Sequence, residues 1–121
     1  MDTNTIILLA FALIAVGLLR NSLARKRSIS DPAQVTEALQ SGALVVDVRT
    51  PAEFEQDHFP GAVNIPLQEI GQRAGELMDQ QIILYCNSGN RTANAVAILG
   101  RKGVTRVVNA GGLHQLRNAA P

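Results

Sequence analysis

The sequence has a single cysteine, no tryptophan and only 3% aromatic residues. One cysteine excludes a disulfide within the chain, and with it the small folds that disulfides hold together. It also excludes a zinc site made of several thiolates, and the two histidines, His58 and His114, are too far apart in the sequence to suggest one. We therefore expect no metal and no cofactor. Since aromatic residues are scarce, a hydrophobic core has to consist mainly of Val, Ile, Leu and Ala.

Charge is unevenly distributed along the 121 residues, a length that suits one domain. The formal net charge is +1, but four of the eleven basic residues lie within eight positions, at Arg20, Arg25, Lys26 and Arg27. Without residues 1–27, which hold these four and one acidic residue, residues 28–121 have seven basic and nine acidic residues, a net charge of −2. A domain with this charge has no general attraction for nucleic acid, and we expect no such partner.

A long apolar segment occupies the N-terminus. Residues 3–19 are 17 uncharged residues, and residues 6–19 contain no polar side chain. As a helix, this segment would span roughly 26 Å, slightly less than a hydrocarbon core of about 30 Å. Because the Arg20 side chain can extend toward the head groups, residues 3–24 can complete the span. We expect a single-pass anchor in the inner (cytoplasmic) membrane, since the segment lacks the polar face of a buried core helix.

A cleaved signal peptide is the alternative interpretation of this segment, and residues 22–24 resemble a small-residue cleavage site. A signal peptide, however, has basic residues before its apolar stretch, whereas here Asp2 precedes the stretch and the basic residues come after it. The sequence therefore favours an anchor. The basic cluster predicts that the remainder of the chain lies in the cytoplasm. This divides the chain into a membrane anchor helix with its basic flank, residues 1–27, and a domain, residues 28–121.

Apolar runs and helix-capping signals alternate in residues 28–121. Nearly continuous apolar runs predict strands at residues 43–48, 62–65, 82–85 and 104–108. Helices are predicted from the capping sequence Ser30-Asp31-Pro32 to Gly42, at residues 51–56, 67–78 and 91–101, and in a short stretch after Gly111-Gly112. Alternation of strands and helices indicates an α/β domain, with a mainly parallel sheet that has helices on both faces.

One strand-to-helix loop has an unusual composition. The strand at residues 82–85 leads directly into Cys86, and the N-terminus of the next predicted helix would stabilise a thiolate and lower its pKa. Gly89 and the two asparagines tolerate left-handed backbone angles, so that successive N–H groups can point at one centre. Arg91 adds a positive charge for an oxyanion. The same residues also fit a buried structural cysteine before a polar turn, so the loop alone leaves both interpretations open.

Three further motifs accompany the loop motif Cys86-x-x-Gly89-x-Arg91. They are Asp47-Val48-Arg49-Thr50-Pro51-Ala52-Glu53-Phe54, His58-Phe59-Pro60-Gly61-Ala62-Val63-Asn64-Ile65-Pro66-Leu67, and Gly111-Gly112. Together the four motifs, in matching order over residues 28–120, resemble the rhodanese family. The resemblance implies a rhodanese-like five-stranded, mostly parallel sheet flanked by helices, here preceded by one N-terminal transmembrane helix. It also implies a cysteine that takes a sulfane sulfur, holds it as a persulfide and passes it to a thiophilic acceptor.

Applied to this sequence, the resemblance makes Cys86 the catalytic residue that carries the persulfide. The substrate-binding residues would be the next five, whose backbone would surround the sulfur: Asn87, Ser88, Gly89, Asn90 and Arg91. The Arg91 side chain would attract an anionic donor such as thiosulfate; a protein persulfide is another donor, and a thiol or a cyanide-like compound would be the acceptor. Two departures concern the rim of the site: Asp57 stands where the family usually has Gly, and no Trp follows Gly111-Gly112.

Several other polar residues are interpreted as structural. Asp47, Arg49 and Glu53 are expected to form ion pairs that hold the turn after the strand at residues 43–48. In a rhodanese-like fold, His58 is expected to support a loop rather than to act as a base, because a thiolate stabilised by a helix needs no partner base. We expect Tyr85 in the core, and we assign no role to His114.

Two other functions are compatible with this loop. A phosphatase or arsenate-type enzyme is related by fold, but its chemistry needs five residues between Cys and Arg, and four lie between Cys86 and Arg91. A non-catalytic module that senses a persulfide or binds a protein is the second alternative. A sensor would accept sulfur in stoichiometric amount and then stop, so turnover distinguishes it from a sulfurtransferase.

Overall fold

Parallel strand pairing organises the part of the chain after the N-terminal helix. The structure is a computed structural model that describes residues 2–27 and 29–121, and within these residues four strands form one sheet in the order β2-β1-β3-β4. The strands are β1 (Leu44–Asp47), β2 (Val63–Asn64), β3 (Ile82–Cys86) and β4 (Val107–Gly112), and each neighbouring pair is parallel. Parallel neighbours cannot be joined by tight hairpins, so helices make the connections.

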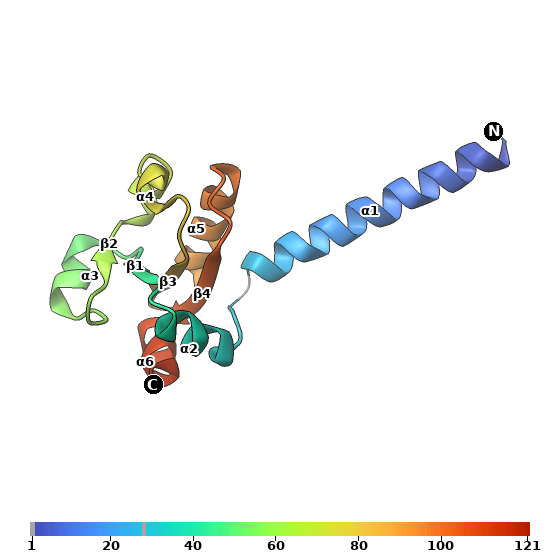
Figure 1. The fold of residues 1–121 in the computed structure, drawn as a ribbon. Helices are drawn as coiled ribbons and strands as arrows, with labels where there is room; N and C mark the ends of the chain where they lie inside the picture. The colour runs from blue at the N-terminus through green and yellow to red at the C-terminus, as the bar shows by residue number, and fades with distance from the viewer. Residues whose placement is uncertain (1, 28) are drawn as a thin grey trace.

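Helices cover both faces of the sheet (Figure 1). One face packs against α2 (Pro32–Gln40) and α6 (Leu113–Ala119). The other face packs against α4 (Leu67–Ile70), the 3-10 helix η1 (Ala74–Leu77) and α5 (Asn90–Arg101). A further short helix, α3 (Pro51–Gln56), comes after β1. The predicted α/β architecture with helices on both sides of a parallel sheet is confirmed.

The predicted helix starts are formed by their capping residues. The Asp31 side chain accepts a hydrogen bond from Ala33 N at 2.8 Å, and Pro32 begins α2. At α3, Thr50 and Glu53 form a capping box, in which each side chain accepts a hydrogen bond from the backbone N–H of the other. Both helices therefore begin where short polar side chains satisfy N–H groups that the helix itself leaves without partners.

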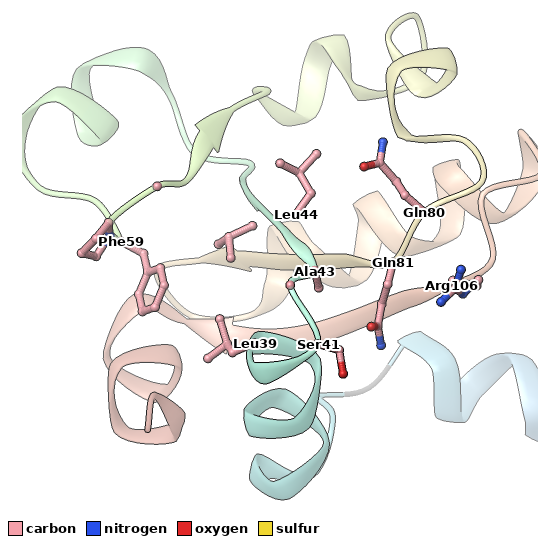
Figure 2. A pocket seen from close by; sticks show the side chains of 12 residues that line it. Leu39, Ser41, Ala43, Leu44, Phe59, Gln80, Gln81 and Arg106 are labelled. Atoms are coloured by element: carbon pink, nitrogen blue, oxygen red, sulfur yellow. The ribbon is translucent and has the colours of Figure 1, made fainter.

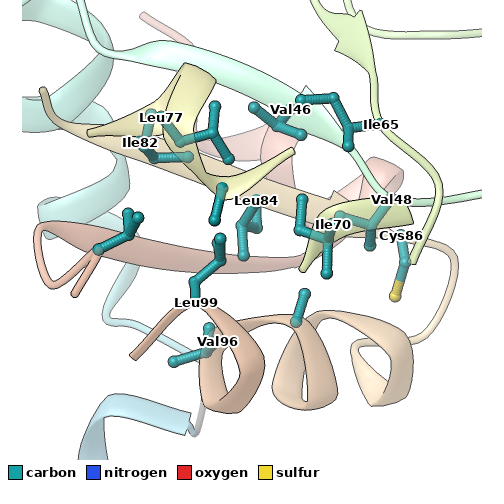
Figure 3. Packing of buried hydrophobic residues seen from close by; sticks show 13 residues of the cluster. Val46, Val48, Ile65, Ile70, Leu77, Ile82, Leu84, Cys86, Val96 and Leu99 are labelled. Carbon is teal, nitrogen blue, oxygen red and sulfur yellow. The ribbon is translucent and has the colours of Figure 1, made fainter. Parts of the chain in front are cut away.

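The core is divided into two clusters because side chains of a strand alternate between its faces. Along β3, Ile82, Leu84 and Cys86 face α5, whereas Ile83 and Tyr85 face α2 and α6. Figure 3 shows the first cluster, with Cys86 at one end of it. Cys86, which the sequence predicts to be reactive, is thus the last side chain of β3 that faces α5, and β3 is fully buried.

The expected fifth strand is absent from the described residues. The segment that would extend the sheet beyond β4 is short: Ser30 N donates to Asn109 O at 2.8 Å, and Asn109 N donates to the Ser30 hydroxyl oxygen at 3.1 Å. Because the second bond uses a side chain, and because α2 begins at Pro32, residues 29 and 30 form no strand beside β4. The prediction of five strands was wrong, and the sheet has four.

Two other elements differ clearly from the prediction, whereas the remaining strands and α5 differ only by about one residue at an end. The helix expected at residues 67–78 is interrupted between α4 and η1, in keeping with the low helix propensity of Gly71 and Gly75. The strand expected at residues 104–108 begins later, at Val107, and continues to Gly112. Its register shifts opposite residues 84–86 of β3, because β4 carries one extra residue there, with Gly111 at a φ of +78°.

The N-terminal helix α1 (Thr3–Arg27) extends away from the sheet (Figure 1). Its segment Thr3–Arg20 has a mean hydropathy of 2.0 and is not buried against the rest of the chain. By length and composition this helix is able to cross a membrane, a property that it shares with signal sequences. Residue 28, where the predicted domain begins, lies outside the described residues.

Candidate active site

Cys86 lies at the carboxyl end of β3, at the base of a loop formed by residues 86–92, which we call the cysteine loop. Its side chain is fully buried, and the sulfur accepts a hydrogen bond from Gly89 N at 2.9 Å. The hydroxyl of Thr92, in the first turn of α5, lies 3.9 Å from the sulfur and donates to Gly89 O at 2.7 Å. The loop therefore bends around the sulfur, and α5 begins directly beside it.

The loop lowers the pKa of the Cys86 thiol. Burial raises the pKa, but hydrogen bonds from the backbone N–H groups of Thr92, Gly89 and Ser88 lower it by more, so the net shift is downward. N–H groups at a helix N-terminus stabilise a negative charge, and here the charge is the thiolate. The site thus favours the nucleophilic form of the cysteine.

Two glycines allow the cysteine loop to take this shape. Gly89 is the N-cap of α5 and has a φ of +94°, in the left-handed region that side chains other than glycine rarely adopt. Gly112, at the end of β4, lies against the loop, and a Cβ added there would overlap the carbonyl oxygen of Asn87. Gly112 is therefore needed for close approach of β4 to the loop.

The side chain of Arg91 is held by a carboxylate from α3. Arg91 Nη1 and Nη2 donate to the two oxygens of Glu53 at 2.6 and 2.9 Å. Asn87 Nδ2 donates to the same carboxylate at 2.6 Å. The Arg91 hydrogen bond lowers the pKa of Glu53 to about 2, so that this carboxylate is ionised at neutral pH. Glu53 therefore pairs with the cysteine loop, and not with Asp47 and Arg49 as the sequence suggested.

Asp47 and Arg49 form the buried ion pair that was expected from the sequence. Arg49 Nη2 lies 2.6 Å from Asp47 Oδ2, and both side chains are almost completely buried. Arg49 also donates to Asp57 O at 2.6 Å and to Asn87 Oδ1 at 3.2 Å. Through Arg49, the pair therefore connects the turn after α3 with Asn87 of the cysteine loop.

A residue of the segment before α2 covers one side of the cysteine loop. A Cβ added at Gly89 would lie 3.1 Å from Ile29 Cδ1, and one at Gly111 would lie 3.2 Å from the same atom. Ile29 thus packs over Gly111 and over Gly89, whose N–H donates to the Cys86 sulfur, while Ile29 remains 46% exposed. It forms an apolar wall at the rim of the site.

Other polar residues singled out in the sequence have structural contacts. His58 Nδ1 is 2.8 Å from Phe54 O, and its ring stacks on that of Phe54 at 3.9 Å, in keeping with support of a loop. Tyr85 is buried, and its hydroxyl accepts a hydrogen bond from Phe59 N at 3.0 Å. Asp57, the departure from the family pattern, forms an exposed ion pair with Arg117 of α6 at 2.6 Å.

A cavity elsewhere in the fold is separate from this location, and no metal site is found among the described residues. In residues 2–27 and 29–121, no three His, Cys, Asp or Glu side chains come together in a way that could hold a metal ion. Figure 2 shows a cavity of about 600 Å³ at the amino ends of the strands, lined among others by Leu44, Gln81 and Arg106. Cys86 lies at the other end of β3, so this cavity is separate from the cysteine loop.

The sequence identified the loop but not all of its partners. Cys86 ends β3, and Asn90 and Arg91 begin α5, so residues 87–89 connect the strand to the helix within the segment that the sequence singled out. Glu53 was recognisable as a capping residue of α3, but nothing local to it indicated a contact with Arg91, 38 residues away. No sequence pattern indicated the contact of Ile29 with the cysteine loop, because that contact depends on where the segment before α2 meets β4.

Comparison with known proteins agrees with this geometry. The sequence is 39% identical over 74 residues to thiosulfate sulfurtransferase PspE of Escherichia coli (strain K12). The aligned region covers 59% of this chain and 71% of that protein. It is 32% identical over 114 residues to the uncharacterized protein YqhL of Bacillus subtilis (strain 168), which covers 91% of this chain and 89% of that one.

Solved structures give the same assignment. A rhodanese with anions from E. coli matches with a TM-score of 0.59 and 37% identity, covering 66% of this chain and 95% of that one. A rhodanese-related protein from Thermoplasma volcanium matches with a TM-score of 0.64 and 28% identity, covering 77% of this chain and 94% of that one. The family model described as a rhodanese-like domain matches residues 31–119, and the chain belongs to the rhodanese-like domain family.

Proposed function

We propose that this chain is a sulfurtransferase that carries sulfane sulfur as a persulfide on Cys86. The observation that carries the proposal is the environment of the sulfur, which accepts the Gly89 N–H at 2.9 Å beside the N-terminus of α5. A thiolate stabilised in this way is a good nucleophile near neutral pH. Relatives named thiosulfate sulfurtransferase support the same assignment.

The reaction proceeds in two displacements. In the first, the Cys86 thiolate attacks the outer sulfur of thiosulfate, the S–S bond of thiosulfate breaks, and sulfite leaves with the bonding electron pair. In the second, a nucleophilic acceptor such as cyanide or a thiolate attacks the outer sulfur of the persulfide. The bond between the two sulfurs breaks, and the Cys86 thiolate is regenerated. Both steps conserve electrons, so no external oxidant or reductant is required.

The residues of the cysteine loop have distinct parts in this proposal. The N–H groups of residues 87–91 surround the outer sulfur, which is anionic once the persulfide has formed. The family resemblance gives Arg91 the role of attracting an anionic donor, and in this structure its guanidinium is paired with Glu53. The four-residue spacing between Cys86 and Arg91 forms a small loop that suits one sulfur atom better than a phosphate.

We propose further that α1 anchors the domain to a membrane as a single span, through residues 3–24. Its apolar segment is long enough to cross a bilayer and packs against nothing else in the described chain. The basic residues come after the apolar segment, and by charge bias this favours a domain on the cytoplasmic side. A reporter fused to the C-terminus tests this orientation: a signal from the cytoplasm is expected, and a signal from outside would contradict it.

Intact-mass spectrometry tests the proposed chemistry. The full chain in detergent is incubated with thiosulfate, and wild type is compared with Cys86→Ser. Wild type is expected to gain the mass of one sulfur atom, and to lose it again on addition of cyanide or a thiol. The variant is expected to gain none. Sulfur uptake without continued turnover would favour a persulfide sensor, and no uptake from any sulfane donor would reject the sulfurtransferase.

A further inference from the structure

The Glu53 carboxylate neutralises the positive charge of Arg91, which would otherwise be free to bind an anion. Its Oε1 accepts Arg91 Nη1 at 2.6 Å, and its Oε2 accepts Arg91 Nη2 at 2.9 Å. This bidentate arrangement, two parallel N–H···O bonds to one planar guanidinium, is the one that arginine uses to bind oxyanions in general. A protein carboxylate therefore occupies the face of Arg91 that an anionic donor would use.

The position of Glu53 is fixed from the side of α3 as well. Oε1 also accepts the backbone N–H of Thr50 at 3.1 Å and its hydroxyl at 3.0 Å, within the capping box. Oε2 also accepts Asn87 Nδ2 at 2.6 Å. The Glu53 side chain is 27% exposed and that of Arg91 is 33% exposed, so the ion pair is accessible from solvent, whereas Cys86 is fully buried.

The pairing changes which donors the site attracts. An unpaired Arg91 would present a cation to any small anion, whereas the observed pair presents groups with no net charge. A small anionic donor has to displace Glu53 from Arg91 and is repelled by the displaced carboxylate. A donor whose sulfane sulfur is held on another protein can be recognised by surface contacts and does not need the guanidinium.

We propose that Glu53 determines donor specificity at Cys86: its carboxylate occupies Arg91 in place of an anionic donor and disfavours small anions relative to sulfane sulfur held on a protein. This inference rests on the proposed sulfurtransferase function. Glu53 is a specificity residue in this account, because it does not touch the reacting sulfur.

The variant Glu53→Gln removes the charge of this side chain and keeps part of its hydrogen bonding. With its amide oxygen at the place of Oε1, Gln keeps the acceptor for Thr50 and for Arg91 Nη1, and Gln also forms capping boxes. It loses the negative charge and the acceptor at Oε2. Glu53→Ala is the second variant, which also removes the charge. Glu55→Gln is the matched control, since Glu55 is an exposed carboxylate on the same helix.

The first measurement needs no sulfur chemistry. Cys86 is alkylated in the full chain in detergent with iodoacetate, which is anionic, and with iodoacetamide, which is neutral. Because both reagents react with the thiolate, the ratio of their rates cancels any change in the thiolate population. The rate with iodoacetate divided by the rate with iodoacetamide is expected to rise about fivefold in Glu53→Gln and Glu53→Ala. This is the effect of removing one charge at contact distance in a water-like medium. The ratio is expected to stay unchanged in Glu55→Gln.

The second measurement tests the donor itself. The KM for thiosulfate is expected to fall in Glu53→Gln, with kcat little changed. Because thiosulfate carries two negative charges, the free-energy effect is twice that on iodoacetate, which corresponds to about 25-fold in KM. An unchanged or lower alkylation ratio, or a higher KM, would show that Glu53 only positions Arg91 and would overturn the inference. If no variant takes up sulfur from any donor, the proposed function fails, and donor specificity fails with it whatever the alkylation ratio.

Discussion

Gly112 determines how closely β4 approaches the cysteine loop. In Gly112→Ala the new Cβ would meet a backbone carbonyl, that of Asn87, so the loop has to move as a whole. Overpacking of this kind costs about 1–3 kcal/mol. The displaced loop holds the Cys86 thiolate less well, and its pKa rises toward the usual range. We therefore expect a lower unfolding temperature and slower alkylation of Cys86 by iodoacetamide near neutral pH.

Gly100→Ala is the control for this substitution. Gly100 lies in the last turn of α5, and a Cβ there would meet nothing within 4 Å. Alanine is favoured over glycine in a helix by up to about 1 kcal/mol, so this variant is expected to be as stable as wild type or more stable. Equal unfolding temperatures for Gly112→Ala and wild type would show that the loop accommodates the methyl group.

The ion pair between Glu53 and Arg91 predicts a pH dependence of stability. The Arg91 hydrogen bond lowers the pKa of Glu53 from 4.5 to about 2 on folding. Because the folded pKa is the lower one, the pair contributes stability that is complete above pH 4.5 and is lost as the pH falls toward about 2. The free energy of unfolding, measured with urea between pH 4.5 and about 2, is expected to fall more steeply with decreasing pH in wild type than in Glu53→Gln. Parallel curves would contradict the assignment.

At the residue scale, local spacing was informative and distant pairing was not. The sequence singled out Cys86, Gly89 and Arg91 because a strand end, a left-handed turn and a helix start succeed one another within a few positions, and because the rhodanese-like motifs supported that choice. The partner of Arg91 lies 38 residues away on α3. Which carboxylate reaches it depends on how the turn after β1 packs against the cysteine loop, and no local pattern encodes that packing.

At the scale of elements, the first turn of α5 and the loop before it lower the pKa of Cys86. The pKa of Cys86 is raised by burial and lowered by more through hydrogen bonds from the backbone and side chain of Thr92 and from the N–H groups of Gly89 and Ser88. Thr92→Val keeps the shape of the side chain but removes a hydroxyl that contacts the sulfur and holds Gly89 O. The rate of alkylation against pH is expected to move to higher pH, by a fraction of a unit to about one unit.

The control for this variant is Thr105→Val, an exposed threonine outside the cysteine loop. Its alkylation profile is expected to coincide with that of wild type. A profile of Thr92→Val that also coincides with wild type would mean that the backbone N–H groups alone set the thiolate pKa.

Elements were predicted well where capping signals marked their ends and less well elsewhere. Asp31 and Thr50 begin α2 and α3 as expected, because a side chain that caps a helix acts within a few residues. The strand count failed for a different reason. The segment at Ile29 and Ser30 lies beside β4, but the bonds that it makes there depend on a serine hydroxyl and on the start of α2 at Pro32.

At the scale of the whole molecule, the N-terminal helix and the active site are connected by a short segment that touches both. α1 ends at Arg27, and Ile29 already packs over Gly89 and Gly111. Two residues extend at most about 7 Å, so the cysteine loop lies close to the end of the helix. If α1 crosses a membrane as proposed, the rim of the active site is held near its surface.

Ile29→Ser tests whether this connecting segment is part of the site. Ile29 is about half buried, and replacing it by a polar residue is expected to cost about 1 kcal/mol. Since the side chain covers the cysteine loop, the loop opens more often, and iodoacetamide is expected to alkylate Cys86 several-fold faster in the full chain. Val63→Ser is the matched control: Val63, on β2, is 40% exposed, against 46% for Ile29. If both variants alkylate at the wild-type rate, the segment only links α1 to the domain. If Ile29→Ser alone is faster, residues outside the matched family region, 31–119, help to enclose the reactive sulfur.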